Sequence, residues 1–433
     1  MKKMLSTKKL GVLSVALVLA AAQTLGFMET KAQAAGLALG KKVVKIGYAG
    51  PHKMESGKCL VNGAQMAIDE VNATGGVLGS KLELIAADSE LTAIGAANAI
   101  DKMVLRDRVD FVIGAESSEE GTAFLTAAAK NKMLTLIQGT QDAVEKAYLK
   151  DKERNKYIFN FGPSPVDQVK VGIETLRVVI SAVKKNLGID VVNVGFIRDE
   201  DTWTHSISGV LKPIIDKMPD AKFVYDSTTS RDASDFSVQL SQIKSNKVHV
   251  LYGMLARPSF YPLVKQLKET ETPAFLTGVL PLSMFPPVFL RAVGDDNAAY
   301  TTTFSLGIHP VDERTGDMLE KYKKRYGQYP AYQGAYGYLM VQTIVRALKE
   351  VKTLDQDALV RAVEKVKIPA NESWGGQIVF KDTHRVNYHQ QDGFPLYIFQ
   401  YVQKGKMNIV WPDEIKTSDI VVPDNIIEYW KNK

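Results

Sequence analysis

The sequence is poor in cysteine and in long apolar segments. Its 433 residues include one cysteine, Cys59, so the chain cannot form an internal disulfide. Beyond residue 22, no apolar run approaches the roughly 18 residues that a membrane-spanning helix needs. We therefore expect a hydrophobic core, rather than cross-links or a bilayer, to stabilise the fold. About 400 residues are enough for two lobes.

Motifs of enzyme chemistry are also missing. The sequence has no G-x-S-x-G nucleophile elbow, no P-loop lysine motif, no H-E-x-x-H and no pair of C-x-x-C. His384 and His389 are five positions apart, which is a poor spacing for binding a shared metal ion. We expect a binding protein rather than an enzyme, with no cofactor and no metal site.

The first 34 residues have the composition of an export signal. Four lysines, within residues 2–9, precede an apolar stretch from Leu10 to Ala22, and Ala32-Gln33-Ala34 has the small-x-small pattern of a cleavage site. We expect cleavage after Ala34 and a soluble periplasmic protein that does not insert into the membrane. An uncut signal anchor is the alternative, and the small residues before position 35 argue against it.

The charge balance argues against polyanionic partners. The whole chain carries +6, but five lysines and one glutamate in residues 1–34 contribute +4, which leaves +2 for the mature protein. A balance this close to zero does not favour nucleic acid or an anionic membrane surface as a partner. The remaining candidate partner is a small molecule.

Short β-rich runs alternate with amphipathic helical segments along the mature chain. The runs include KLELIAAD, VDFVIG, MLTLIQ, VVNVGFI, VHVLYG and AFLTGV. Strands that alternate with helices predict an α/β fold with parallel sheets covered on both faces. In such sheets ligands bind at the carboxyl ends of the strands. The number of runs is sufficient for two doubly wound sheets.

Several segments, taken in order, resemble one family. IGYAGP, NGAQMAIDEVNATGGVLGSKLELIAAD, VDFVIGAESS and DASDFSVQLSQIK are similar to the type I periplasmic solute-binding proteins of ABC importers, the branched-chain amino acid (leucine/isoleucine/valine)-binding group. The resemblance implies two lobes joined by three crossovers, with ligand in the cleft between them and lobe closure around it. It predicts lobe 1 at residues 43–160 plus 305–378. Lobe 2 is then 163–302 plus 380–433, including a hairpin over Pro395–Trp411 and a terminal helix over Asp424–Trp430.

Ser117 and Ser118 follow the run VDFVIG and open a helical segment. Hydroxyls beside the free N–H groups of a helix N-terminus form a natural seat for an anion. The resemblance implies that Ser118 binds the ligand carboxylate. The alternative is an ordinary helix cap, because a serine followed by Glu119 and Glu120 has the pattern of one. We expect both roles together, and the adjacent Glu116 is unusual because its charge would repel an anion.

The resemblance implies further contacts from both lobes. Gly139, Thr140 and Gln141 fall where the family presents a main-chain group and a hydroxyl to the ligand head. Trp203 falls where lobe 2 supplies an aromatic ring, and polar neighbours on both sides argue against a core position for it. Tyr338 matches an aromatic residue at the cleft, with core packing as the alternative.

The pocket departs from the family at its amine site. Where amino-acid-binding members carry a glutamate for the α-ammonium group, this sequence has Gly278-Val279-Leu280, and we take Val279 as a pocket residue. A buried ammonium without a carboxylate costs several kcal/mol. An amino acid would then need another acidic partner, of which the run Asp199-Glu200-Asp201 offers three. The sequence therefore predicts a carboxylate ligand with an apolar or aromatic body, either an amino acid or an acid without an amine.

Two roles are compatible with such a protein. In the first, it delivers its ligand to an inner-membrane ABC permease, and lobe closure creates the surface that the permease recognises. In the second, the closed form signals to a periplasmic receptor or regulator. Export and the family resemblance both favour the importer.

Overall fold

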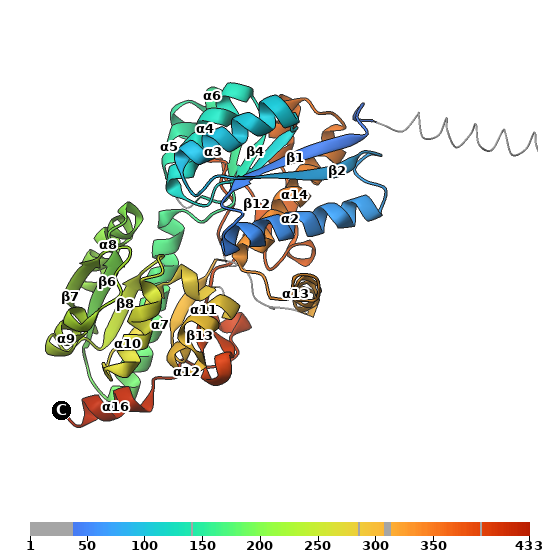
Figure 1. The fold of residues 1–433 in the computed structure, drawn as a ribbon. Coiled ribbons are helices and arrows are strands. Elements are labelled where there is room, and N and C mark those ends of the chain that lie inside the picture. The colour runs from blue at the N-terminus through green and yellow to red at the C-terminus, as the bar shows by residue number, and fades with distance from the viewer. Residues whose placement is uncertain (1–37, 140–141, 285, 307–312, 390–391) are drawn as a thin grey trace, which may run out of the picture.

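The computed structural model describes residues 38–139, 142–284, 286–306, 313–389 and 392–433. Within them the chain forms two α/β lobes, each built on one large sheet (Figure 1). This architecture confirms the predicted fold class. The proposed export signal and its cleavage site after Ala34 lie outside the described residues. None of the helices in the described part of the chain combines the length and the apolar character that a bilayer-spanning helix needs.

Lobe 1 contains a parallel sheet of five described strands in the order β2-β1-β3-β4-β5. Its strands are β1 (Val43–Gly50), β2 (Lys81–Asp88), β3 (Phe111–Gly114), β4 (Thr135–Ile137) and β5 (Ile158–Asn160). Its helices are α2 (Glu55–Ala73), α3 (Ala93–Lys102), η1 (Met103–Asp107), α4 (Ser118–Asn131), α5 (Ala143–Lys150), α6 (Lys152–Asn155), α13 (Glu313–Tyr326), α14 (Tyr332–Val351), α15 (Gln356–Val363) and η3 (Ala370–Glu372). A small antiparallel pair, β11 (Lys367–Ile368) with β12 (Ile378–Val379), completes the lobe.

Lobe 2 contains a sheet of seven described strands in the order β14-β13-β10-β9-β8-β6-β7. Its strands are β6 (Val192–Asp199), β7 (Ala221–Thr229), β8 (Val250–Met254), β9 (Phe275–Val279), β10 (Thr302–Ser305), β13 (Tyr397–Tyr401) and β14 (Met407–Trp411). Its helices are α7 (Pro165–Leu187), α8 (Thr202–Ile215), α9 (Ser237–Ser245), α10 (Phe260–Glu269), η2 (Pro281–Met284), α11 (Pro286–Val293), α12 (Asp295–Ala298), η4 (Gln403–Gly405), η5 (Asp413–Ile415) and α16 (Asp424–Lys431). The pairs β10–β13 and β13–β14 are antiparallel, whereas β6 to β10 run parallel.

Helices α2 and α14 cover one face of the first sheet side by side (Figure 1). Glycines allow their backbones to approach closely. A Cβ atom on Gly63 would lie 1.8 Å from the carbonyl oxygen of Gly334, and a Cβ on Gly337 would lie 2.1 Å from that of Leu60. Any side chain at these positions would push α14 away from α2. The packing of α14 on α2 therefore fixes the position of the amino end of α14.

Two predicted lobe boundaries need correction. Residues 380–389, assigned to lobe 2 from the sequence, return to lobe 1, where Arg385 bridges to Asn160 in β5. The N–H of Asn160 donates to the carbonyl of His384 over 2.8 Å, and the N–H of Val386 donates back to Asn160 over 2.9 Å. The physical reason is that β5 is an edge strand, and this segment satisfies its open backbone groups. Ser305 belongs to β10 and so to the lobe 2 sheet, not to lobe 1.

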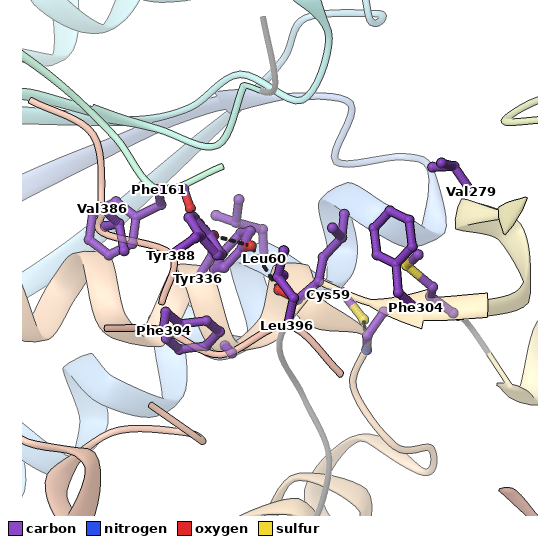
Figure 2. Packing of buried hydrophobic residues seen from close by; sticks show 14 of the residues in the cluster. Cys59, Leu60, Phe161, Val279, Phe304, Tyr336, Val386, Tyr388, Phe394 and Leu396 are labelled. Carbon is purple, nitrogen blue, oxygen red and sulfur yellow. Dashed lines mark hydrogen bonds between the residues drawn. The ribbon is translucent and has the colours of Figure 1, made fainter. Parts of the chain in front are cut away.

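Buried aromatic residues surround the chain crossings between the lobes (Figure 2). The chain leaves lobe 1 after Phe161, leaves lobe 2 after β10 and crosses again between Phe394 and β13. Tyr388 donates its hydroxyl hydrogen to the carbonyl of Phe161, and the hydroxyl of Tyr336 lies 2.8 Å from the carbonyl of Leu306. Side chains of lobe 1 therefore bind the first two crossings directly.

Candidate functional site

The turn from β3 into α4 forms the proposed anion seat. Ala115 has a left-handed backbone with φ +53°, and its N–H donates to the carbonyl of Ala49 over 3.2 Å. The helix then starts with a capping box, in which the N–H of Glu120 donates to the hydroxyl of Ser117 over 3.2 Å. Ser117 is therefore a structural cap, which was one of its two predicted roles. Ser118, the first residue of the helix, is exposed.

The carboxylate of Glu120 is fully engaged in holding this turn. Its Oε2 accepts the N–H groups of Glu116 and Ser117, both over 2.8 Å, and its Oε1 accepts the hydroxyl of Ser89. The cap uses the N–H of Glu120 itself. The N–H groups of Ser118 and Glu119 remain at the open end of the helix, where an α-helix has no internal acceptor for them. These two N–H groups and the Ser118 hydroxyl are suited to bind a carboxylate.

Glu116 lies beside the seat, and the described residues include no charged group of opposite sign that pairs with it. The residue is half-buried, but its Oε1 atom is shut off from solvent and has no hydrogen-bond partner among the described residues. Burial raises the pKa of this carboxyl, a hydrogen bond from Ser56 opposes the rise and the charge of Glu120 adds to it, with a net pKa of about 8. Glu116 is consequently mostly neutral at pH 7, which removes the repulsion expected from its charge.

Other polar atoms near the carboxyl ends of the lobe 1 strands also lack partners. The described residues supply none for the hydroxyl of Tyr48, for Nδ1 of His52 or for Oε1 of Gln138. Tyr48 is 0 % exposed and Gln138 is 4 % exposed. Buried polar atoms nearly always bond to protein, water or ligand. Sequence reasoning missed these three residues, although Gln138 directly follows β4, where ligands of such sheets bind.

Gly139 lies beside Gln138, and its carbonyl is already bound. Nη1 of Arg385 donates to it over 3.2 Å and to the carbonyl of Gly162 over 2.6 Å, while Nε pairs with Glu145 over 3.0 Å. The Arg385 side chain is buried. Gly139 is thus fixed to the first crossing. Thr140 and Gln141, predicted to contact the ligand head, lie outside the described residues.

Trp203 and Val279 lie on lobe 2 near the carboxyl ends of β6 and β9. Trp203 is the second residue of α8, half-buried and packed against the core. Val279 is the last residue of β9 and is buried, and its carbonyl accepts the N–H of Leu255 over 3.2 Å. At Gly278, φ is +134° and a Cβ would lie 2.0 Å from the carbonyl oxygen of Gly253. Close packing of β8 on β9 therefore excludes a glutamate at position 278.

Two of the three acidic residues after β6, Asp199 and Asp201, already have partners, whereas Glu200 is exposed. Asp199 is buried; its Oδ2 accepts the N–H of Ala256 over 2.7 Å, and burial raises its pKa. Asp201 pairs with Arg257, Nε to Oδ2 at 3.1 Å, and with Arg231. Arg257 is thus engaged by Asp201. Neither aspartate offers a free carboxylate for a ligand amine.

Tyr338 lies in the interior of lobe 1. Its hydroxyl donates to Oε2 of Glu70 over 2.6 Å, and its ring packs on Trp374 at 5.1 Å between centroids. Glu70 lies toward the end of α2, far from the strand ends where α2 begins. This position corresponds to the core-packing alternative rather than to a cleft residue. Tyr332, one and a half turns earlier, is close enough to Glu116 for that carboxyl to raise its pKa, although burial is the larger cause.

An apolar cavity of about 500 Å³ lies between the two lobes near the second crossing. Its lobe 2 side includes Met284, Leu290, Phe399 and Met407, and its lobe 1 side includes Leu319 and Tyr332. None of the residues predicted from the sequence lines it. Tyr332 connects it to the surroundings of Glu116, so the region offers both an anion seat and apolar surface. The described residues contain no cluster of His, Cys, Asp or Glu placed to hold a metal ion.

Two α/β lobes, three crossings and polar groups at the carboxyl ends of strands define a hinged two-lobe binding protein. The chain belongs to the periplasmic binding protein family, which matches residues 43–406. Several of the relatives and solved structures described next are named for branched-chain amino acid binding or transport. These proteins bind solutes and are not enzymes, which confirms that prediction.

Relatives of known description share about a quarter of their residues with this chain. A Leu/Ile/Val-binding protein homolog from Brucella melitensis is 24% identical over 403 residues, which cover 90% of this chain and 96% of that protein. An amino acid binding protein from Pseudomonas aeruginosa is 23% identical over 240 residues. That match spans 52% of this chain and 57% of the Pseudomonas protein, so it covers little more than half of each.

Solved structures share the fold at low identity. A protein from Silicibacter pomeroyi, provisionally assigned to branched-chain amino acid ABC transport, has a TM-score of 0.76 at 19% identity, covering 88% of this chain and 99% of that one. A branched-chain amino acid binding protein from Streptococcus pneumoniae in complex with isoleucine has a TM-score of 0.70 at 20% identity, covering 86% and 100%. A solute-binding protein from Rhodopseudomonas palustris in complex with 3,4-dihydroxybenzoic acid has a TM-score of 0.69 at 18% identity, covering 89% and 99%.

Proposed function

We propose that this protein is the extracytoplasmic substrate-binding component of an ABC importer and that it captures a small carboxylate with an apolar or aromatic body. The observation that carries the proposal is the open first turn of α4. There Ser118 is exposed, and its N–H and that of Glu119 are left without intrahelical acceptors. Hydrogen bonds from such groups to a carboxylate contribute about 1.5–3 kcal/mol.

The ligand head binds on lobe 1 and the ligand body meets lobe 2. Ser118 supplies a hydroxyl, Ser117 holds the turn in place, and the loop from Gly139 through Thr140 to Gln141 supplies further polar contacts. Trp203 and Val279 provide apolar surface from the facing lobe when the lobes close. Tyr338 has a partner in the interior of lobe 1 and is not part of this proposed site.

The ligand class follows from the acidic residues. Asp199 and Asp201 already bind groups of the protein, and the close packing at Gly278 leaves no room for a glutamate there. An α-ammonium group would therefore have no buried carboxylate free to receive it among these residues, since the third acid, Glu200, is exposed to solvent, and burying the ammonium would cost several kcal/mol. We infer that the ligand is an acid without an amine. The relatives bind solutes of both kinds: one solved neighbour holds isoleucine and another holds 3,4-dihydroxybenzoic acid.

Residues 1–34 direct the chain to the periplasm, and cleavage after Ala34 releases it. Closure of the lobes about the three crossings brings the two lobe surfaces into one fixed arrangement, which an inner-membrane permease recognises. The hydroxyl bonds of Tyr336 and Tyr388 to the first two crossings support a defined hinge of this kind.

A thermal-shift screen tests the proposal on residues 35–433, after unfolding and refolding to remove any carried-over ligand. Binding to the folded state raises stability by about 2.7 kcal/mol at a hundredfold excess over Kd. The panel pairs leucine, isoleucine and phenylalanine with benzoate, 3-phenylpropanoate and branched keto acids. A shift with acids alone supports the proposed ligand class. A shift with the amino acids would contradict that class, and no shift with any carboxylate would contradict the seat.

The same screen on S118A and W203A identifies the site. We expect both variants to lose a large part of the ligand-induced shift; S118A should keep the melting temperature of the free protein, whereas W203A should lower it because Trp203 packs against the core. Trp411, in β14 on the far edge of the lobe 2 sheet, provides the matched control, since W411A should keep the shift. A shift that persists in S118A would remove this serine from the binding site.

A further inference from the structure

Glu116 is an acidic residue without a cation, placed next to an anion seat. Its main-chain N–H takes part in the turn that holds Ser117, whereas its Oε1 is buried and has no partner among the described residues. No lysine, arginine or histidine pairs with it in the described part of the chain. Glu120, four residues on, has three donors bound to its two oxygens and presents no free hydrogen to Glu116.

Polar groups other than the open end of α4 also lie at the anion seat. The hydroxyl of Tyr48 in β1 and Oε1 of Gln138 after β4 are nine-tenths buried or more, and both lack partners among the described residues. Gln138 lies at the end of β3 as well, because its N–H donates to the carbonyl of Gly114 over 3.0 Å. Tyr48 is close enough to Glu116 for that carboxyl to raise its pKa. Polar groups of β1, β3 and β4 therefore surround one region.

We propose that Glu116 remains protonated in the liganded protein and that this neutral carboxyl makes the seat selective for carboxylates without an amine. The inference rests on the proposed function, because it assigns a selective group to the same seat. A neutral carboxyl beside the ligand adds no negative charge and has a hydrogen to donate, whereas an ionised one would repel the ligand carboxylate. An α-ammonium group would instead require the ionised form.

Burial and a like charge both keep the proton on Glu116, whose pKa rises to about 8. Among the described residues, the groups that interact with it are Ser56 and Cys59 of α2, Tyr48 of β1, Glu120 of α4 and Tyr332 of α14, while Asp88 and, next to it, His52 lie beyond Tyr48. Burial raises the pKa values of Tyr48, Cys59 and Tyr332 above their ordinary range. These three groups therefore stay neutral while Glu116 titrates.

The predicted pH dependence has a definite sign. If only the protonated form of Glu116 binds the acid, the apparent Kd grows as Glu116 ionises, and with a pKa of about 8 it rises about tenfold from pH 7 to pH 9. Benzoate is a suitable probe because its own carboxyl stays ionised across this range. If Glu116 instead holds an ammonium group, affinity rises with pH over the same interval. The sign of the change in affinity with pH therefore shows whether Glu116 is neutral beside an acid or ionised beside an ammonium group.

The experiment is calorimetric titration of the mature wild-type protein, E116Q and E83Q with benzoate and with isoleucine, at pH 7 and pH 9. E116Q keeps the size and neutrality of the protonated carboxyl, so we expect benzoate affinity within about threefold of wild type at pH 7 and less than a twofold change at pH 9. E83Q removes an exposed charge near the amino end of β2, away from the seat, and is the control, which should keep the wild-type affinity and pH dependence.

A second measurement does not depend on any variant folding. Titration of the wild-type protein with benzoate at pH 8, in buffers of different ionisation enthalpy, should reveal uptake of about half a proton per ligand bound. Benzoate binding that is equally tight at pH 7 and pH 9 would overturn the inference and leave the proposed function standing. Isoleucine binding that strengthens with pH and is lost in E116Q would also overturn it, by making Glu116 an ammonium partner. Failure of every carboxylate to bind would reject the seat itself, which is a failure of the proposed function.

Discussion

The hydroxyl oxygens of Tyr336 and Tyr388 lie 2.6 Å apart, between two of the crossings that join the lobes (Figure 2). Tyr388 also contacts the carbonyl of Phe161, and Tyr336 contacts that of Leu306. Three contacts share only two hydroxyl hydrogens, so one of the three is always without a hydrogen. The pair can rearrange its donors without breaking, which suits the lobe closure proposed above.

Removal of one hydroxyl should destabilise the hinge. Y388F leaves the Phe161 carbonyl without its donor in a buried setting, and we expect a loss of about 1–3 kcal/mol in the free energy of unfolding. Urea denaturation followed by fluorescence measures it. Y429F is the control, because the Tyr429 hydroxyl only accepts from Lys433 near the chain end, and it should cost less than about 0.5 kcal/mol. Equal effects of the two changes would show that the pair does not stabilise the fold.

Substitution of Ser117 should change stability, whereas substitution of Ser118 should change ligand affinity. Ser117 caps the helix, so S117A is expected to lower stability by about 1 kcal/mol. Ser118 is exposed and does not cap, so S118A should leave stability unchanged but weaken carboxylate binding by about tenfold, the equivalent of one charge-assisted hydrogen bond. Melting curves and calorimetric titration distinguish the two effects. A loss of stability in S118A without a change in affinity would reverse the assignment.

Glu116 should make stability depend on pH in a particular direction. Its pKa of about 8 in the folded state lies above the value of 4.5 for an ordinary glutamate, so the folded state keeps a proton that the unfolded state has released. Its contribution is fully present below pH 4.5 and is lost as pH rises through 8. The Tm of E116Q should therefore match wild type near pH 4.5 and exceed it increasingly up to pH 8. A constant difference across this range would contradict the raised pKa.

Arg385 should be among the most sensitive charged residues. R385M leaves the carbonyls of Gly139 and Gly162 and the carboxylate of Glu145 without their donor, and removing one partner of a buried pair costs about 3–5 kcal/mol. Because Gly139 belongs to the proposed ligand loop, we also expect weaker ligand binding. R346M, which breaks only a half-exposed pair with Glu372, should cost less than about 1 kcal/mol. Chemical denaturation of both variants provides the comparison.

Cys59 should be inert in the folded protein. Its thiol is buried, burial raises its pKa, and its sulfur accepts the N–H of Ala331 over 3.4 Å. Thiolate is the reactive form of cysteine, so a buried thiol with a raised pKa reacts slowly. We expect no labelling by Ellman's reagent at pH 8 in the native state and one thiol per chain in denaturant. Rapid labelling of the native protein would mean that α2 opens at the hinge.

Local patterns make much of the fold predictable. Alternation of strands and helices depends on hydrophobic periodicity, which is a local property, so the amino-acid sequence is sufficient to indicate the α/β class. The terminal hairpin and helix are visible in the same way. The cap at Ser117 is likewise visible, because Ser117 and Glu120 carry the spacing of a capping box. Gly278 stands out as a departure, but its cause, the 2.0 Å approach of a Cβ to Gly253, depends on the pairing of two strands.

Contacts between distant segments are not predictable in this way. Nothing in residues 380–389 indicates that they cover the edge of β5, because an edge strand accepts any extended segment. Tyr332 and Tyr338 lie on the same helix, but six residues turn them to different sides, and only the packing of α14 on α2 decides which one approaches the seat. The burial of Glu116 is hidden for the same reason, since the groups around it come from four separate elements.

The return of residues 380–389 to β5 restricts the order in which the two lobes can fold. Lobe 1 lacks the side chain of Arg385 and the cover of its edge strand until almost nine-tenths of the chain has been synthesised. Lobe 2 lacks β13, β14 and the Trp430 indole, whose N–H donates to Pro273 over 2.7 Å, until later still. Neither lobe can therefore finish folding on a growing chain. The core of each lobe is complete only when these late segments have joined it.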